Sequence, residues 1–208
     1  MSDIALREDG PLAGARVVIL MESDYVEPEI SYYQHRFAEE GVAVDLATRL
    51  WGQRALTFTG HEYQAPITVE GDLEALDYTA LSKYDALIVP GGMVADRLRY
   101  SEKPGRLAPA AELLRRAFAL PRLVKGLNCH ALWLAAPVPQ TVRGRKLTCH
   151  NNLYSDARNM GADYVDADVV TDGDLVTARS ADLCHLFARR LLDAIASHRG
   201  AAPSGERR

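Results

Sequence analysis

The sequence predicts an α/β protein in three layers, with a mostly parallel sheet between helices. Short runs such as 15–21 and 85–89 are almost wholly apolar, which is typical of strands buried on both faces. Segments with helical spacing separate these runs, and alternating strands and helices build a parallel sheet through right-handed crossovers. The 208 residues, of which 48% are hydrophobic and 25% charged, suit one globular domain.

Residues 15–198 are expected to form this domain, between a flexible N-terminal arm (1–14) and a disordered tail (199–208). The predicted strands are 15–21, 42–47, 57–59, 67–69, 85–89, 122–127, a short strand that leads to Cys149, 168–171 and 175–178. The pair 57–59 and 67–69 is expected to form a hairpin outside the main sheet. The predicted helices are 28–40, 104–119, one that begins near 131, 151–160 and 181–197.

Composition excludes several classes of function. The formal net charge of −4 argues against a nucleic-acid partner, which would require a basic face. No apolar run approaches the roughly 18 residues that a membrane span requires, and the charged first residues do not suit a signal peptide. Three cysteines fit free thiols in a reducing compartment. We therefore expect a cytoplasmic protein without membrane or nucleic-acid partners.

The chain is organised around the stretch 126–134, in which Asn128, Cys129 and His130 interrupt two apolar runs. The first run ends abruptly, as a buried strand does, and the second is rich in alanine and leucine and favours a helix. A cysteine on a strand-to-helix turn is lifted from the sheet edge toward the helix N-terminus, which stabilises a thiolate. Cys129 is thus predicted to be a nucleophile with a lowered pKa. The alternative is a buried, inert cysteine.

Other polar segments follow predicted strands at the same edge of the sheet. They are Glu22–Glu29, Gly91–Asp96, Cys129–His130 and Cys149–His150. Ligands of open parallel sheets bind beyond the carboxyl ends of the strands. We therefore expect these segments to form one site.

These segments resemble the PfpI family, whose relatives include cysteine proteases, deglycases, glyoxalases and isonitrile hydratases. The resemblance covers about 16–192 and rests on Glu27–Glu29, Asp85–Gly92, Asn128–His130, Asn159–Ala162, Val169–Asp174 and Ala181–Leu183. It implies a flavodoxin-like fold similar to class I glutamine amidotransferase domains. Two departures suggest a reshaped pocket: Ala131-Leu132 replaces the usual Gly, often followed by Pro, and Val26 replaces an acidic residue.

The resemblance also implies roles for individual residues. Glu29 matches a glutamate that approaches the cysteine sulfur, where it would be protonated and donate to the thiolate; otherwise it is a carboxylate at a helix start. His130 would carry protons at neutral pH. Asp96 matches a carboxylate that, in family hexamers, orients this histidine from a neighbouring subunit; otherwise it is a surface charge.

The remaining candidates line the pocket or bind the substrate. Gly91 and Gly92 permit a close approach of the backbone, and the N–H groups of Gly92 and His130 could form an oxyanion hole. Ala131 and His150 are expected beside them. We expect no metal, because the two Cys-His dipeptides do not have zinc-finger spacing.

The function predicted from sequence is a cofactor-independent hydrolase or lyase. Cys129 would attack an electrophilic carbon of a small molecule or peptide, in a homo-oligomer (dimer or hexamer). A redox sensor or chaperone-like protein with an oxidisable Cys129 is the alternative. An amidotransferase-like domain that serves a partner is a weaker reading, because 184–187 lacks the glutamate of a late His-x-Glu pair.

Overall fold

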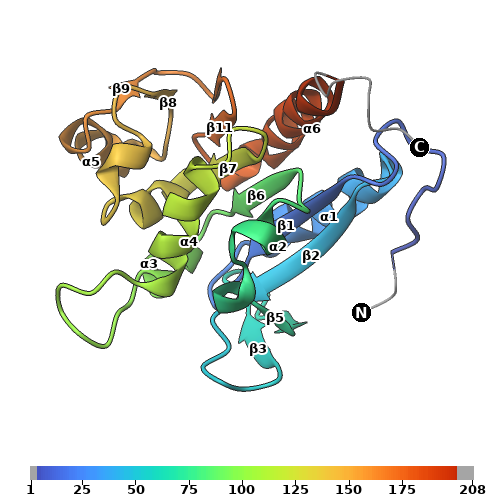
Figure 1. Cartoon of the computed structure of the whole chain (residues 1–208), viewed down its shortest axis with the longest axis horizontal. Coiled ribbons are helices and arrows are strands. Elements are labelled where there is room, and N and C mark those ends of the chain that lie inside the picture. Colours follow the sequence, from blue (N-terminus) through green and yellow to red (C-terminus); the bar gives the residue numbers. More distant parts are fainter. Residues whose placement is uncertain (1–3, 201–208) are drawn as a thin grey trace.

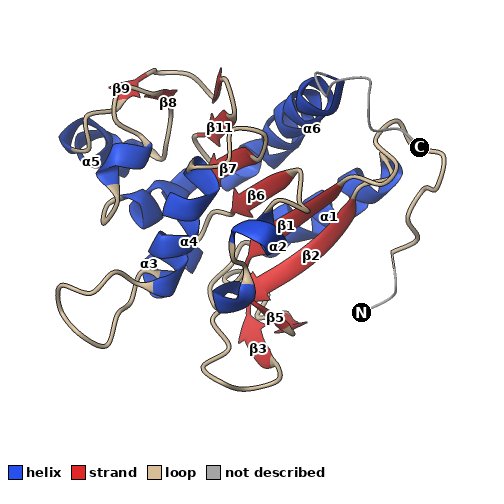
Figure 2. Cartoon of the chain, in the orientation of Figure 1, coloured by secondary structure: helices blue, strands red, loops and turns tan. Residues whose placement is uncertain are grey.

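A seven-stranded sheet forms the centre of the molecule, with helices on both faces (Figures 1 and 2). The computed structural model describes residues 4–200. The strand order is β10-β11-β7-β6-β1-β2-β5, and every neighbouring pair is parallel except β10–β11. The strands are β1 (Arg16–Leu20), β2 (Ala43–Thr48), β5 (Gly71–Asp72), β6 (Ala86–Val89), β7 (Val124–Asn128), β10 (Val169–Asp172) and β11 (Leu175–Ala178). The predicted fold class is confirmed.

Two small sheets and six α-helices complete the described chain. The strands β3 (Leu56–Thr59) and β4 (Pro66–Val69) form the predicted outer hairpin, and β8 (Lys146–Leu147) pairs with β9 (Asp163–Tyr164). The α-helices are α1 (Glu27–Glu39), α2 (Tyr78–Leu81), α3 (Val94–Leu98), α4 (Pro109–Phe118), α5 (Tyr154–Asn159) and α6 (Cys184–Gly200). Short 3₁₀ helices span Leu73–Ala75, Cys129–Ala135, Pro139–Thr141, Asn151–Leu153 and Ala181–Leu183.

The structure describes part of each predicted terminal segment. From residue 4 the N-terminal segment is packed against the end of α1: the N–H of Leu12 donates to the Glu40 carbonyl at 2.8 Å, and that of Arg7 to the Ala38 carbonyl at 3.0 Å. Leu12 is only 8% exposed. At the other end, α6 includes residues 199 and 200, and the rest of the predicted tail lies outside the described residues.

Close packing of α1 and α6 against the sheet fixes the elements that carry the site. Gly126 in β7 allows this, because a Cβ there would lie 3.0 Å from side-chain atoms of Phe187 and Leu191 on α6. The ring of Tyr33 on α1 stacks on Phe37 at 5.7 Å between centroids and contacts Phe187 at 5.8 Å. Helices α1 and α6 therefore share one apolar layer under β7.

A buried ion pair lies at the other end of β7 from Cys129. The side chain of Lys125 is fully buried and pairs with Asp174 in the β10–β11 turn. Lys125 also donates to the Leu120 carbonyl at 3.3 Å, and Arg145 donates to Asp174 at 2.8 Å. These contacts fix the β10–β11 turn to the start of β7.

No helix in the described range 4–200 has the length and apolar character needed to cross a membrane.

Candidate active site

Cys129 occupies a sharp turn directly after β7. Its φ of 58° lies in the left-handed region, which non-glycine residues rarely adopt and which is common at functional sites. The side chain is buried, with 8% of the residue exposed. Backbone N–H groups of Ala181, His130 and Gly92 donate toward Sγ. The turn thus presents the sulfur to main-chain donors from three segments.

The pKa of Cys129 differs from the sequence prediction. Burial, followed by the charge of Glu29, raises the thiol pKa to about 11, although the three N–H groups lower it. The helix that follows is a 3₁₀ helix rather than the predicted α-helix. The prediction of a lowered pKa was wrong because it considered the helix N-terminus and not the removal of the thiol from water.

Glu29 is the buried carboxyl group of the site. It is fully inaccessible, and its Oε1 accepts from Tyr33 Oη and Asn128 Nδ2, each at 2.8 Å. The Gly91 N–H donates to Oε2 at 2.9 Å. Burial raises the Glu29 pKa against these three lowering donors. This shift is in the direction of the protonated form that was expected beside the thiolate.

Glu29 and Cys129 lie on either side of Gly91. A Cβ on Gly91 would lie 3.0 Å from Glu29 Oε2 and 3.1 Å from the Cys129 Cβ. The charge of Glu29 also acts directly on the thiol. A side chain at position 91 would therefore crowd both the carboxyl group and the cysteine.

His130 lies against the sulfur and a second imidazole. Its Nδ1 is 3.2 Å from Cys129 Sγ, and its ring stacks on His150 with centroids 4.4 Å apart and planes 24° apart. Trp133 contacts the other side at 4.9 Å between centroids. Burial, and then the His150 charge, lower the His130 pKa. The neutral imidazole is therefore favoured and can accept the thiol proton.

Asp96 and Ala131 are not brought to the sulfur within one chain. Asp96 is exposed on α3, and within residues 4–200 its carboxylate makes no hydrogen bond or ion pair. The neighbouring Arg97 pairs instead with Asp24. The Ala131 methyl is fully buried in the hydrophobic core, because the 3₁₀ turn directs it inward. The expectation that Ala131 lines the pocket is thus incorrect for its side chain.

Glu27, the first acidic residue of α1, supports a loop. Its carboxylate accepts N–H groups of Tyr63 at 2.8 Å, Glu62 at 3.0 Å and Ala65 at 3.3 Å. Burial opposes ionisation, yet these donors lower the Glu27 pKa. The two glutamates of α1 therefore differ: Glu27 holds the β3–β4 loop and Glu29 faces the cysteine.

Sequence reasoning did not assign Tyr33, Asn128 or Ala181 to the contacts around Glu29 and Cys129. Tyr33 stands one helical turn after Glu29, and Asn128 directly precedes the cysteine, so their spacing could have indicated both. The Ala181 N–H carries no side-chain signal. Among the described residues, no group of three or more His, Cys, Asp or Glu side chains is arranged to hold a metal ion.

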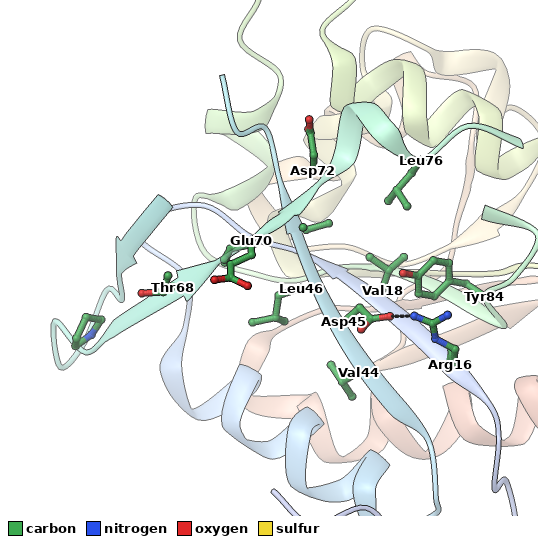
Figure 3. Close-up of a pocket in the computed structure, with 14 residues that line it drawn as sticks. Arg16, Val18, Val44, Asp45, Leu46, Thr68, Glu70, Asp72, Leu76 and Tyr84 are labelled. Atoms are coloured by element: carbon green, nitrogen blue, oxygen red, sulfur yellow. Dashed lines mark hydrogen bonds and ion pairs between the residues drawn. The ribbon is translucent and has the colours of Figure 1, made fainter. Parts of the chain in front are cut away.

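A cavity of about 770 Å³ lies elsewhere, along β2 (Figure 3). Val18, Val44 and Leu46 form part of its wall, and Arg16 pairs with Asp45 at 2.6 Å beside them. No residue of the Cys129 site lines this cavity. The candidate chemistry is therefore separate from it.

The fold and the site together define a class: a parallel α/β domain with a cysteine on the turn after a central strand and a buried glutamate beside it. The family model described as DJ-1/PfpI matches residues 15–194. The chain therefore belongs to the DJ-1/PfpI family, as its sequence motifs predict.

Curated relatives and solved structures agree with this assignment. A deglycase of Pyrococcus abyssi is 34% identical over 166 residues, which cover 79% of this chain and 89% of the relative. A deglycase of Pyrococcus horikoshii is 34% identical over 172 residues, or 81% and 92% of the two chains. The crystal structure of Drosophila melanogaster DJ-1beta has a TM-score of 0.72 at 21% identity, covering 88% of this chain and 91% of that one. This last likeness concerns the fold.

Proposed function

We propose that the protein is a cysteine-dependent enzyme in which Cys129 attacks an electrophilic carbon of a small molecule or peptide. The observation that carries the proposal is the 3.2 Å contact between Cys129 Sγ and His130 Nδ1, on a turn whose surrounding N–H groups face the sulfur. A thiol with a pKa of about 11 is a poor nucleophile by itself at neutral pH, so the contact with a base matters.

The geometry supports a two-part mechanism. Nδ1 of His130 accepts the Cys129 proton as the sulfur forms a bond to the carbon, and the displaced electron pair moves to the carbonyl oxygen. We expect the main-chain N–H groups beside the sulfur to stabilise that oxyanion: those of Gly92 and His130, as the sequence suggests, together with that of Ala181. Protonation of Glu29 would keep negative charge away from the thiolate, and the hydrogen bonds from Tyr33, Gly91 and Asn128 hold its carboxyl group in place. None of these steps requires a cofactor.

Deglycase-like chemistry is the reaction we favour within this class. Both Pyrococcus relatives are named deglycases, and they match over most of their lengths. Their name points to substrates in which an α-oxoaldehyde is attached to an amine or thiol. The carbon of such an adduct is at the aldehyde or carbonyl oxidation level, which suits attack by a thiolate. Peptidase, glyoxalase and isonitrile hydratase activity remain the competing reactions.

The proposal includes a homo-oligomer in which Asp96 of one subunit orients His130 of the next. It is supported by the exposure of Asp96 and by the lack of a partner for its carboxylate within residues 4–200. Asp96→Asn would then lower activity without changing the stability of the subunit. Light scattering that shows an active monomer at assay concentration would remove this part of the proposal.

The cytoplasm is the compartment we propose, because Cys129, Cys149 and Cys184 are all free thiols.

The activity is tested with the adduct of methylglyoxal and N-acetylcysteine, followed by its loss of absorbance. Wild-type protein should consume the adduct, and Cys129→Ala should abolish turnover while melting like the wild type. Cys184→Ala serves as the matched control, because Cys184 is a free cysteine on a different element. Wild-type turnover by Cys129→Ala would disprove the role of the nucleophile. Peptide and isonitrile substrates, tested in parallel, separate the competing reactions.

A further inference from the structure

Two Cys-His dipeptides lie side by side at the carboxyl edge of the sheet. The backbone N–H of His150 donates to the Cys129 carbonyl at 3.2 Å, and the rings of His130 and His150 stack at 4.4 Å. Both contacts place residue 130 beside 150 and residue 129 beside 149. Cys149 is therefore the lateral neighbour of the proposed nucleophile.

The relation between these two cysteines suits a disulfide. Neighbouring backbones joined in this way run about 5 Å apart, and disulfides join Cα atoms about 4.4–6.8 Å apart. Both thiols are free and buried, with 8% and 1% of the residues exposed. Burial, then the charges of Asp156 and Cys129, raise the pKa of Cys149 to about 12.

We propose that Cys149 is a resolving cysteine, which captures oxidised Cys129 as an intramolecular disulfide. The proposal rests on the reactive Cys129 of the proposed function and names a second residue and a second chemistry for this site. The oxidant is a hydroperoxide. Without Cys149, further oxidation of Cys129 would lead to sulfinic acid, which most proteins cannot reverse.

The reaction balances in two steps. In the first, the Cys129 thiolate attacks the peroxide after passing its proton to His130: an S–O bond forms and the O–O bond breaks, giving a sulfenic acid. The hydroxide or alkoxide that leaves takes up the proton from His130 as water or an alcohol. In the second, the Cys149 sulfur attacks Cys129 Sγ, so that the S–S bond forms and the S–O bond breaks. The hydroxide that leaves takes up the Cys149 proton as water. Two thiols have lost two electrons, and the peroxide has gained them.

Disulfide formation would switch the enzyme off reversibly, because it consumes the nucleophile. Sγ of Cys129 must turn away from the N–H groups of Gly92 and Ala181 to reach its neighbour. A dithiol reductant would restore both the thiol and the site. Cys184, half-buried at the start of α6, has no such backbone link to Cys129 in the described structure and provides the control.

The test exposes the full-length wild type, Cys149→Ala, Cys149→Ser and Cys184→Ala to an excess of hydrogen peroxide, because a sulfinic acid requires two equivalents of peroxide per thiol. Intact mass, peptide mapping after alkylation, and turnover before and after dithiothreitol are measured. Wild type and Cys184→Ala should lose the mass of two hydrogens, yield a peptide that links 129 to 149, and regain full turnover on reduction. Both Cys149 variants should instead gain two oxygens at Cys129 and stay inactive after reduction.

The inference is overturned if wild type forms the sulfinic acid as fast as Cys149→Ala, if Cys129 resists peroxide, or if Cys129 links to Cys184. Two Cys149 variants are compared so that at least one should melt and turn over like the wild type before oxidation. If the resolving role of Cys149 is wrong, turnover before oxidation is unaffected. Failure of the proposed function appears separately, as turnover that persists in Cys129→Ala.

Discussion

The Glu29 carboxylate accepts a 2.8 Å hydrogen bond from the side chain of Asn128, the residue directly before the cysteine. This contact joins the first turn of α1 to the end of β7 across 99 positions of the sequence. Because Tyr33 and Gly91 also donate to Glu29, the carboxyl group is fixed in position beside Cys129 by three separate elements. The acid and the nucleophile are therefore positioned together.

Glu29→Gln should remove a pH dependence of stability as well as activity. Burial raises the Glu29 pKa in the folded state, so its protonated form stabilises the fold below the unfolded pKa, and this contribution is lost as pH rises through the raised folded pKa. Denaturant unfolding at a series of pH values should show the wild-type free energy of unfolding falling across this window. The variant should lack that fall.

The same substitution should also lower turnover, because it disturbs the hydrogen bonds that hold this side chain beside Cys129. If its oxygen faces Asn128 and Tyr33, the Gln amide loses the 2.9 Å hydrogen bond from the Gly91 N–H to Oε2 and keeps only the longer one of 3.2 Å to Oε1. Tyr33→Phe removes one donor, keeps the carboxyl group and serves as the control, with a loss of about 1 kcal/mol in stability. Equal pH slopes for wild type and Glu29→Gln would contradict the assignment.

His150→Phe should move the acid limb of the pH–rate profile to higher pH. Burial, followed by the charge of His150, lowers the His130 pKa, and a phenyl ring keeps the stacking contact without that charge. The His130 pKa should therefore rise, so that the neutral imidazole is lost at a higher pH. The pH profile of kcat/KM reports the His130 pKa in the free enzyme. An unchanged acid limb would mean that His130 does not set it.

Gly92→Ala should destabilise the fold far more than Gly52→Ala. Both glycines have positive φ, 71° and 78°, so each variant bears a conformational cost of about 1 kcal/mol. An added Cβ meets nothing within 4 Å at Gly52 but lies 2.3 Å from the Asp24 carbonyl oxygen at Gly92. Thermal melts should show a lower melting temperature for the Gly92 variant than for the Gly52 variant, which corresponds to a further loss of about 2 kcal/mol or more in the free energy of unfolding. Similar melts for both would refute this clash.

Asp174→Asn should cost about 3–5 kcal/mol, because it leaves the buried Lys125 ammonium without a counter-charge. Lys125→Met should cost less, since methionine fills the space without a charge. Urea denaturation of both variants measures the difference. Asp172→Asn, which disturbs a half-buried pair with Arg145, is the matched control. If Lys125→Met proves the more damaging, the ion pair is a net stabilising contact.

The sequence allowed the fold to be predicted because its signals are local. Runs such as 86–89 are wholly buried, and the family motifs lie on turns whose position follows from strand order. The same reasoning located Cys129, Glu29 and His130, because each occupies a turn or helix start at one sheet edge.

The electrostatics and the supporting contacts were harder to predict. The thiol pKa depends on how much water the surrounding chain excludes, which no local pattern records. Ala131 follows the nucleophile in sequence, yet a 3₁₀ turn sends its methyl into the core. Likewise, the packing of residues 4–14 depends on main-chain bonds to the end of α1, and a polar composition does not reveal these bonds.

The anchoring of the β3–β4 loop by Glu27 has a consequence for how this protein can diversify. The Glu27 carboxylate accepts hydrogen bonds from main-chain N–H groups of residues 62, 63 and 65, and these bonds do not depend on the side chains of those residues. Substitutions can therefore change the polarity and charge of this loop while its anchor, two residues from Glu29, is kept. The fold thus combines a reactive centre fixed by hydrogen bonds with a surface loop whose side chains are not part of its anchor, an arrangement well suited to laboratory selection for new substrates.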